Sequence, residues 1–187
     1  MRLFVAVNLP LSEKERLDAI LDVLKRSALP FRWVESESLH ITLKFLGEVT
    51  EAKYDAVVAG IARAGAGISP FDVDMSGFGA FPSRAQPRIL WVAIGASALL
   101  GEAQRRVEDE MESLGFPREA RPFHAHVTLG RARSRDGGVV GEQLDRITAP
   151  LVYKARVRVE SIDLMRSRTA PGGARYERVE RVMLAIN

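Results

Sequence analysis

The stretch Leu39-His40-Ile41-Thr42-Leu43 recurs later in the chain as Ala125-His126-Val127-Thr128-Leu129. In an extended strand alternate side chains share a face, so each copy presents a histidine and a threonine on one side and aliphatic side chains on the other. A duplicated half of roughly 90 residues would account for the spacing of the copies and for the length of the chain. We therefore predict two half-domains that face each other across a cleft, each with one copy of the motif.

The segments around the two motifs alternate between helical and extended patterns. Apolar residues at helical spacing predict helices that begin at the capping box Ser12-x-x-Glu15, at Thr50 and at Ser97, and a further helix over 139–147. Extended runs predict strands over 3–8, 39–45, 71–78, 89–94, 125–130, 154–165 and 176–186. The segments 82–87, 133–138 and 169–173 are predicted as loops. This order lacks a regular strand-helix-strand rhythm, which favours an α+β fold with antiparallel or mixed sheets.

The composition is that of a chain with a hydrophobic core and without cysteine chemistry. Of the 187 residues 47% are hydrophobic and none is cysteine. Disulfides, thiolate catalysis, cysteine-based zinc sites and iron–sulfur clusters are thereby excluded. No apolar run approaches the roughly 20 residues that a membrane span requires, and no signal peptide is recognised. We expect a cytoplasmic protein that does not associate with a membrane.

Arginine is unevenly distributed along the chain. The net charge is only +3, but arginines are dense over 118–135 and 156–181. Such a distribution predicts local positive potential, and the guanidinium group suits phosphate because it forms paired, charge-assisted hydrogen bonds. The alternative for any one of these arginines is a solvated position on the surface.

Two histidines beside two hydroxyls form a set of groups suited to phosphodiester chemistry. In-line displacement at phosphorus requires a base for the attacking oxygen and an acid for the leaving oxygen, on opposite sides. Histidine can serve in either role near neutral pH, and hydroxyls can donate hydrogen bonds to the non-bridging oxygens. Because the chain has only three histidines, the occurrence of two of them in matching motifs indicates a catalytic pair.

The sequence resembles the 2H phosphoesterase superfamily, in particular its RNA 2′,3′-cyclic phosphodiesterases, also called 2′-5′ RNA ligases. The resemblance covers nearly the whole chain and is carried by residues 2–7, 33–34, 39–47, 78–82, 121–131 and 164–167, followed by Gly172, Gly173 and Tyr176. It implies a single domain over 1–187, built of two interleaved lobes related by a pseudo-twofold axis. Two mostly antiparallel sheets would face each other across a V-shaped cleft, with helices outside.

The activity that the resemblance implies is hydrolysis of a 2′,3′-cyclic phosphate to a 2′-phosphomonoester, without a metal or other cofactor. By the resemblance, His40 is the acid that protonates O3′ and His126 is the base that activates water. Thr42 and Thr128 hold the phosphate. The two motifs are alike, so the acid and base roles can be exchanged. We expect a monomer that acts on RNA with 2′,3′-cyclic phosphate ends, such as tRNA fragments, or on cyclic nucleotides.

Two further residues match family positions but raise a question of orientation. Arg131 matches an arginine near the phosphate, and Phe45 matches an aromatic residue near the nucleotide. Strict alternation points both side chains away from the histidines. Gly130 allows a bulge that re-aims Arg131, whereas a place in the core fits Phe45 equally well.

Other interpretations stay open from the sequence. His124, His126 and His40 could form a three-histidine metal site, and Lys44 and Arg84 are either phosphate contacts or surface charges. The same acid and base could run the reverse reaction, in which a 5′-hydroxyl opens the cyclic phosphate and joins two RNA ends. The cleft could also only bind RNA, although the chain lacks the aromatic runs and glycine clamps typical of RNA-binding modules.

Overall fold

The chain folds into one large antiparallel sheet with helices packed outside it. A computed structural model describes residues 1–133, 141–170 and 173–185. The helices are α1 (Leu11–Arg26), α2 (Glu51–Gly65), α3 (Ala98–Ser113) and α4 (Gly141–Thr148), with a short 3-10 helix, η1 (Ser36–Ser38). The strands are β1 (Arg2–Asn8), β2 (Phe31–Trp33), β3 (His40–Glu48), β4 (Phe71–Pro82), β5 (Pro87–Ile94), β6 (His126–Ala132), β7 (Lys154–Val159), β8 (Ser161–Ala170) and β9 (Gly173–Met183). The predicted α+β class is therefore confirmed.

The sheet is a single path of strands in which the two motif strands are neighbours. Its order is β7-β4-β5-β6-β3-β1-β8-β9, and β2 pairs with β6. β3 and β6 meet through the antiparallel pair Ile41–Val127. We predicted two separate sheets, whereas the described strands form one, because the fully buried central residues of the two motifs pair with each other.

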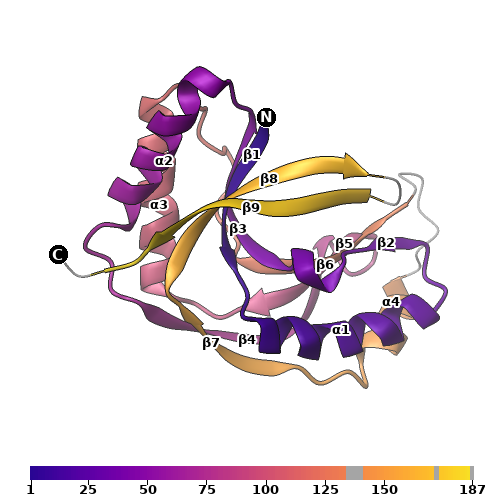
Figure 1. Cartoon of the computed structure of the whole chain (residues 1–187). Helices are drawn as coiled ribbons and strands as arrows, with labels where there is room; N and C mark the ends of the chain where they lie inside the picture. Colours follow the sequence, from indigo (N-terminus) through magenta and orange to yellow (C-terminus); the bar gives the residue numbers. More distant parts are fainter. Residues whose placement is uncertain (134–140, 171–172, 186–187) are drawn as a thin grey trace.

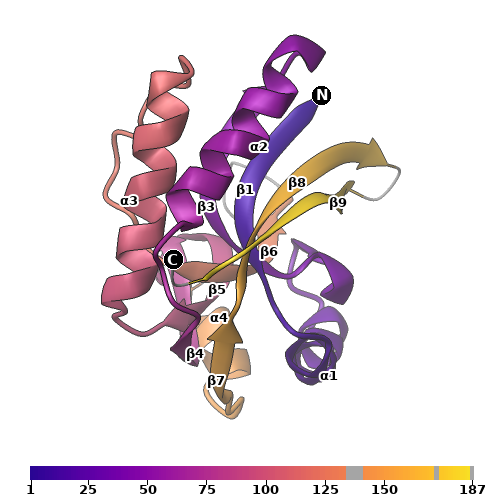
Figure 2. The same cartoon turned by 60° about the vertical axis from the view of Figure 1, so that its left-hand side comes forward.

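Helices α2 and α3 lie side by side, on the other side of the molecule from α1 and α4 (Figure 1). Figure 1 also shows the β8–β9 hairpin passing over the middle. The turned view keeps α2 and α3 side by side (Figure 2), where α2 packs against α3, β8 and β9, and α3 packs against β3. No helix among the described residues is long and apolar enough to cross a lipid bilayer.

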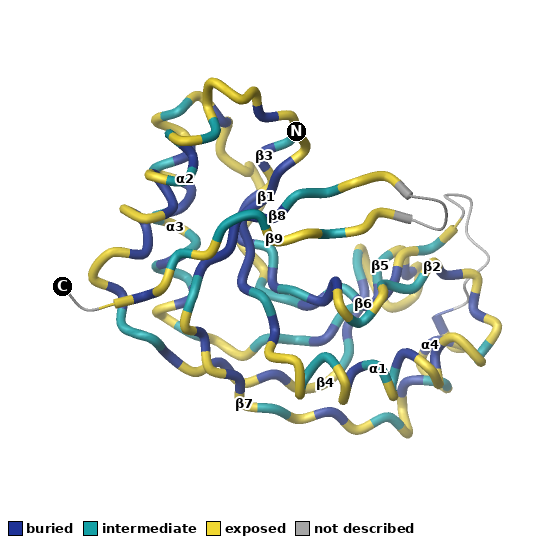
Figure 3. The backbone as a smooth tube through the Cα atoms, in the orientation of Figure 1, coloured by how far each residue is buried: buried dark blue, intermediate teal, exposed yellow. Residues whose placement is uncertain are grey.

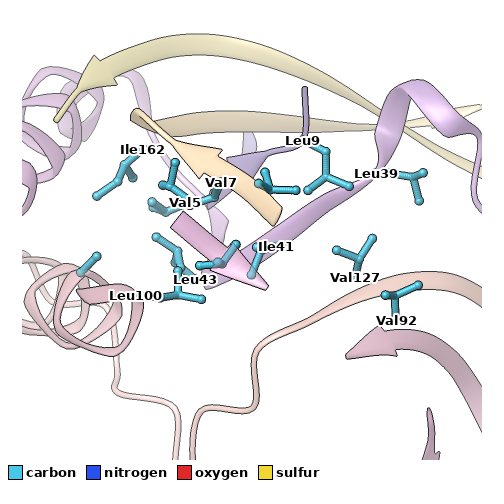
Figure 4. Packing of buried hydrophobic residues seen from close by; sticks show 14 of the residues in the cluster. Val5, Val7, Leu9, Leu39, Ile41, Leu43, Val92, Leu100, Val127 and Ile162 are labelled. Atoms are coloured by element: carbon cyan, nitrogen blue, oxygen red, sulfur yellow. The ribbon is translucent and has the colours of Figure 1, made fainter. Parts of the chain in front are cut away.

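The core lies between these helices and the central strands. Buried segments run through β1 and β3 and along the inner sides of the helices (Figure 3). Ile41 and Val127 are part of this core, together with Val5, Val7 and Leu43 (Figure 4). The apolar face of both motif strands is thus held by packing, which fixes the direction in which their polar face points.

Several element boundaries differ from the sequence prediction. α1 begins at Leu11 with Pro10 at its N-cap, so Ser12 lies inside the helix and the predicted capping box is not formed. Thr50 occupies the N-cap of α2 without a side-chain hydrogen bond, whereas the hydroxyl of Ser97 accepts one from the Leu100 amide at the start of α3. The strand predicted over 154–165 is divided at Glu160 into β7 and β8. The short strand β2 was not predicted, and residues 134–140 of the predicted loop and helix lie outside the described part of the chain.

Candidate active site

The two motifs lie side by side with their polar side chains on the same face of the sheet. Ile41 and Val127 pair directly and are both fully buried. Because side chains alternate along a strand, the neighbours of this pair point to the opposite face, which therefore carries both histidines and both threonines. The charge of His126 is among the causes that lower the pKa of His40, so the two rings lie within electrostatic reach of each other.

His40 is half-buried and is held at both ring nitrogens. Its Nδ1 donates a hydrogen bond to the main-chain carbonyl oxygen of Ser38, at 2.7 Å. Since a carbonyl oxygen can only accept, this bond fixes the proton on Nδ1 and leaves the lone pair on Nε2 when the ring is neutral. Nε2 lies 3.0 Å from the hydroxyl of Thr42. The orienting carbonyl belongs to η1, immediately before β3.

His126 is held in the same way by the chain that precedes β6. Its Nδ1 donates to the carbonyl oxygen of His124, at 2.7 Å. In both motifs the orienting group is thus the main-chain carbonyl two residues before the histidine. Each ring presents Nε2 as the nitrogen that is available to accept or donate a proton.

A bulge at the same position of each motif strand reverses the alternation of side chains. Along β3, Ala6 pairs with Thr42 and Val5 with Lys44, so Leu43 is an extra residue. Along β6, Trp91 pairs with Thr128 and Leu90 with Gly130, so Leu129 is extra. A bulge of this kind places two residues opposite one and shifts the following side chains to the other face.

The bulges bring Phe45 and Arg131 to the face that carries the histidines. Each lies five positions after its histidine, and the side chain of Phe45 is 66% exposed rather than part of the core. The positive charge of Arg131 lowers the pKa of both His40 and His126, which means that it lies within electrostatic reach of the two rings. Strict alternation would point these side chains away from the histidines, but the bulges interrupt it. The bulges lie at Leu43 and Leu129, and not at Gly130 as the sequence suggested.

Both histidines have lowered pKa values. Burial lowers the pKa of His40 from 6.5 to about 4, and the positive charges of Lys14 and Arg131 lower it further, against the opposing effect of the Ser38 carbonyl. Burial also lowers the pKa of His126, against the effect of the His124 carbonyl. Burial penalises the charged form because it removes water from the ring. Both rings are consequently neutral at pH 7 before an anion binds.

Aromatic side chains flank each histidine. The rings of Phe4 and Tyr176 lie 4.9 Å and 5.2 Å from the ring of His40, between centroids. On the other side, the rings of Phe81 and Trp91 lie 5.1 Å and 6.1 Å from that of His126. No motif in the sequence marks these four residues as part of the site, because they come from four other strands and only the register brings them together.

Two of the other candidate residues are engaged elsewhere. Lys44 is only 4% exposed, and its Nζ lies 2.5 Å from a carboxylate oxygen of Glu108 and 2.7 Å from the carbonyl oxygen of Pro117. The interpretation of Lys44 as a phosphate contact or a surface charge is therefore wrong, since the bulge at Leu43 turns it toward α3. Arg84 binds the carboxylate of Asp145 in α4 and the carbonyl oxygen of Phe78.

The three histidines do not assemble into a metal centre. The rings of His124 and His126 are 6.2 Å apart, between centroids. Within the described ranges, no group of three or more His, Asp or Glu side chains is placed to hold a metal ion.

Comparison with known proteins places this geometry in a family. Residues 7–91 and 94–176 match the family described as LigT-like phosphoesterase. An RNA 2′,3′-cyclic phosphodiesterase of Methanothermobacter thermautotrophicus is 31% identical over 185 residues, covering 96% of this chain and 97% of that relative.

Solved structures share the fold over almost the whole chain. The protein TT0787 of Thermus thermophilus superposes with a TM-score of 0.82 at 28% identity, covering 98% of both chains. Escherichia coli LigT in complex with 3′-AMP superposes with a TM-score of 0.75 at 25% identity, covering 98% of this chain and 97% of that one.

Proposed function

This chain belongs to the LigT-like phosphoesterase family, and we propose that it opens the 2′,3′-cyclic phosphate at the end of an RNA strand to leave a 2′-phosphate. The observation that carries the proposal is the pairing of Ile41 with Val127, from which it follows that His40 and His126 share one face. The curated relative is named for this activity, and the LigT structure contains a nucleotide monophosphate.

The proposed reaction uses the Nε2 atom of each histidine. His126 takes a proton from water while the water oxygen bonds to phosphorus. The bond from phosphorus to O3′ breaks on the opposite side, and His40 donates a proton to O3′. Thr42 and Thr128 donate hydrogen bonds to the non-bridging oxygens, where negative charge is held through the transition state. The two Nδ1 bonds to main-chain carbonyls support these roles, since they keep Nε2 as the reacting atom of both rings.

To act as an acid, His40 must become protonated when the substrate binds. With a pKa of about 4, the ring is neutral in the unliganded protein. A bound phosphodiester brings a negative charge close to the ring and thereby favours the imidazolium form. Arg131 is the proposed ligand of a non-bridging phosphate oxygen, and Phe45 the proposed contact to the nucleotide.

The proposal includes a pseudo-twofold relation between two interleaved lobes of a single domain. Ile41 and Val127 are equivalent residues of the two motifs, and an antiparallel pair of equivalent residues lies on a local twofold axis. The equivalent bulges at Leu43 and Leu129 support the same relation. A reactive cleft at this axis would take one catalytic histidine from each lobe, and both come from one chain, which supports action as a monomer.

Replacement of each histidine tests the proposal, with the third histidine as a matched control. His40→Ala and His126→Ala should each lower the release of 2′-phosphate from a cyclic-ended oligonucleotide by at least about 10²-fold, the usual contribution of one general acid or base. His124→Ala removes a ring near the site but keeps the main-chain carbonyl that orients His126. Its rate of 2′-phosphate release should therefore stay within about tenfold of the parent rate. Turnover retained in both His40→Ala and His126→Ala would refute the proposal.

A further inference from the structure

A hollow lies on the His40 side of the sheet, beside Tyr176. It has a volume of about 350 Å³ and is formed by the end of β1, the first turn of α1, the junction of β7 with β8, and β9. Met165 and Tyr176 line it and also belong to the cluster that packs on Phe4 beside His40. Because the ring of Tyr176 is 5.2 Å from that of His40, the pocket adjoins the candidate active site.

The register of the strands shows that this pocket continues the face that carries His40. His40 pairs with Asn8 of β1, Ala6 of β1 pairs with Asp163 of β8, and Asp163 pairs with Arg181 of β9. Paired residues point to the same face, and neighbouring strands lie about 4.8 Å apart, so β9 is about 14 Å from β3 along the sheet. One extended ligand can therefore contact His40 and the pocket together.

The pocket carries more positive than negative charge. Its lining includes the cations Lys14, Arg158, Arg178 and Arg181, and the carboxylates Glu37 and Glu160. Burial lowers the pKa of Lys14 against the effect of the Glu37 carboxylate, and the repulsion from the charge of Arg178 lowers it further. An anion bound among them would relieve this repulsion.

A buried carboxylate, that of Asp163, forms ion pairs with two of these arginines. Asp163 is fully buried and lies 3.9 Å from an Nη atom of Arg178 and 3.4 Å from Nε of Arg181. It also accepts hydrogen bonds from Asn8 at 2.7 Å and from Ser161 at 3.0 Å. The two arginine side chains remain 45% and 47% exposed. A guanidinium group has five N–H donors, so anchoring one side leaves donors directed to the solvent.

We propose that this pocket binds the phosphodiester that precedes the cyclic phosphate in the RNA strand, an inference that rests on the function proposed above. A 2′,3′-cyclic phosphate ends the strand, so the rest of the RNA leaves through the 5′ oxygen of the terminal nucleotide. Its first phosphodiester carries one negative charge and two non-bridging oxygens, which the guanidinium groups of Arg158 and Arg178 match. Tyr176 lies between the two sites, beside the connecting nucleotide.

The consequence is a preference for oligonucleotides over cyclic mononucleotides, because a mononucleotide has no second phosphate. The test compares kcat/KM for a 2′,3′-cyclic mononucleotide with that for a dinucleotide with the same cyclic end. The parent protein should have the higher kcat/KM for the dinucleotide. The slope of log kcat/KM against log salt concentration should also be steeper for the dinucleotide by roughly 0.7, as expected for one additional phosphate on a single strand. The double variant Arg158→Gln/Arg178→Gln should lower kcat/KM for the dinucleotide by about tenfold and remove the additional salt dependence.

The chain offers a matched control on the same two strands. Arg156 lies on β7 and pairs with Asp74 as Arg158 pairs with Asp72, and Arg175 lies exposed on β9, but neither lines the pocket. Arg156→Gln/Arg175→Gln removes the same charge and should keep the preference for the dinucleotide. An equal loss in the control, an equal loss on both substrates in the test variant, or a parent without any preference would overturn the proposal.

A binding measurement separates this inference from the proposed function. The affinities of a mononucleotide and a dinucleotide that both end in a 2′-phosphate are measured for the parent and for the double variant. Should the parent hydrolyse neither cyclic substrate, the proposed function fails, while tighter binding of the dinucleotide that is lost in Arg158→Gln/Arg178→Gln still supports the pocket. Equal binding of the two ligands by the parent would refute the proposed binding of a phosphodiester in the pocket, whatever the outcome of the activity assay.

Discussion

Replacing His40 with Gln should remove an acid-dependent loss of stability that the parent protein shows. Burial holds the pKa of His40 at about 4 in the folded protein, against about 6.5 for histidine in an unfolded chain. Between these values the unfolded chain binds a proton that the folded protein does not, so the free energy of unfolding falls as the pH falls through 6.5. At pH 4.5 the difference between the two pKa values predicts a loss on the order of 2 kcal/mol relative to pH 8.

Urea unfolding followed by tryptophan fluorescence at pH 8 and pH 4.5 measures this loss in both proteins. Other groups titrate alike in the two proteins, so the difference between their losses isolates His40. His40→Gln should lose less stability on acidification, on the order of 2 kcal/mol, whatever its stability at pH 8. Equal losses in the two proteins would mean that His40 is not held neutral by burial, and the proposed dependence of its protonation on bound phosphate would then be refuted.

Three further predictions follow from the site. Arg131→Gln should lower kcat/KM by about 10- to 100-fold, as expected for a lost charge-assisted hydrogen bond, and should leave the urea midpoint unchanged; unaltered kinetics would exclude Arg131 as a phosphate ligand. Lys44→Met should destabilise the fold by about 3–5 kcal/mol because it leaves the buried Glu108 unpaired, and Lys44→Met/Glu108→Leu should restore most of this in the same unfolding assay. The pH profile of kcat/KM, which reports the free enzyme, should lie at lower pH than that of kcat, because the pKa values of His40 and His126 are lowered before phosphate binds; coincident profiles would contradict this.

The local pattern of the sequence predicts most elements of the fold. Period-two runs of Val and Ile identify most of the strands, and apolar residues at helical spacing identify the helices, because these periodicities follow from which face is buried. The division of 154–165 at Glu160 was missed, since the run contains no glycine or proline at that point. There the chain passes from pairing with β4 to pairing with β1 and β9, which is a tertiary event without a local signal.

At the candidate site too, the local sequence pattern predicts some features and misses others. His40 and His126 stand out because their motif is repeated, and parity along a strand places their threonines beside them. The bulge residues Leu43 and Leu129 are aliphatic and buried like Ile41 and Val127 two positions before them, so the apolar alternation runs through the bulge and does not reveal an extra residue. For this reason alternation placed Phe45 and Arg131 on the wrong face.

Histidine-selective nitrogen NMR measures directly whether one phosphate contacts both imidazoles. Titrating the 15N-histidine-labelled protein with a 2′-nucleotide monophosphate follows the three rings separately. We expect the Nε2 signals of His40 and His126 to shift along a single saturation curve and the pKa values of both rings to rise on binding, with a smaller response of His124. A response confined to one of the two rings, or two curves with different midpoints, would contradict this expectation.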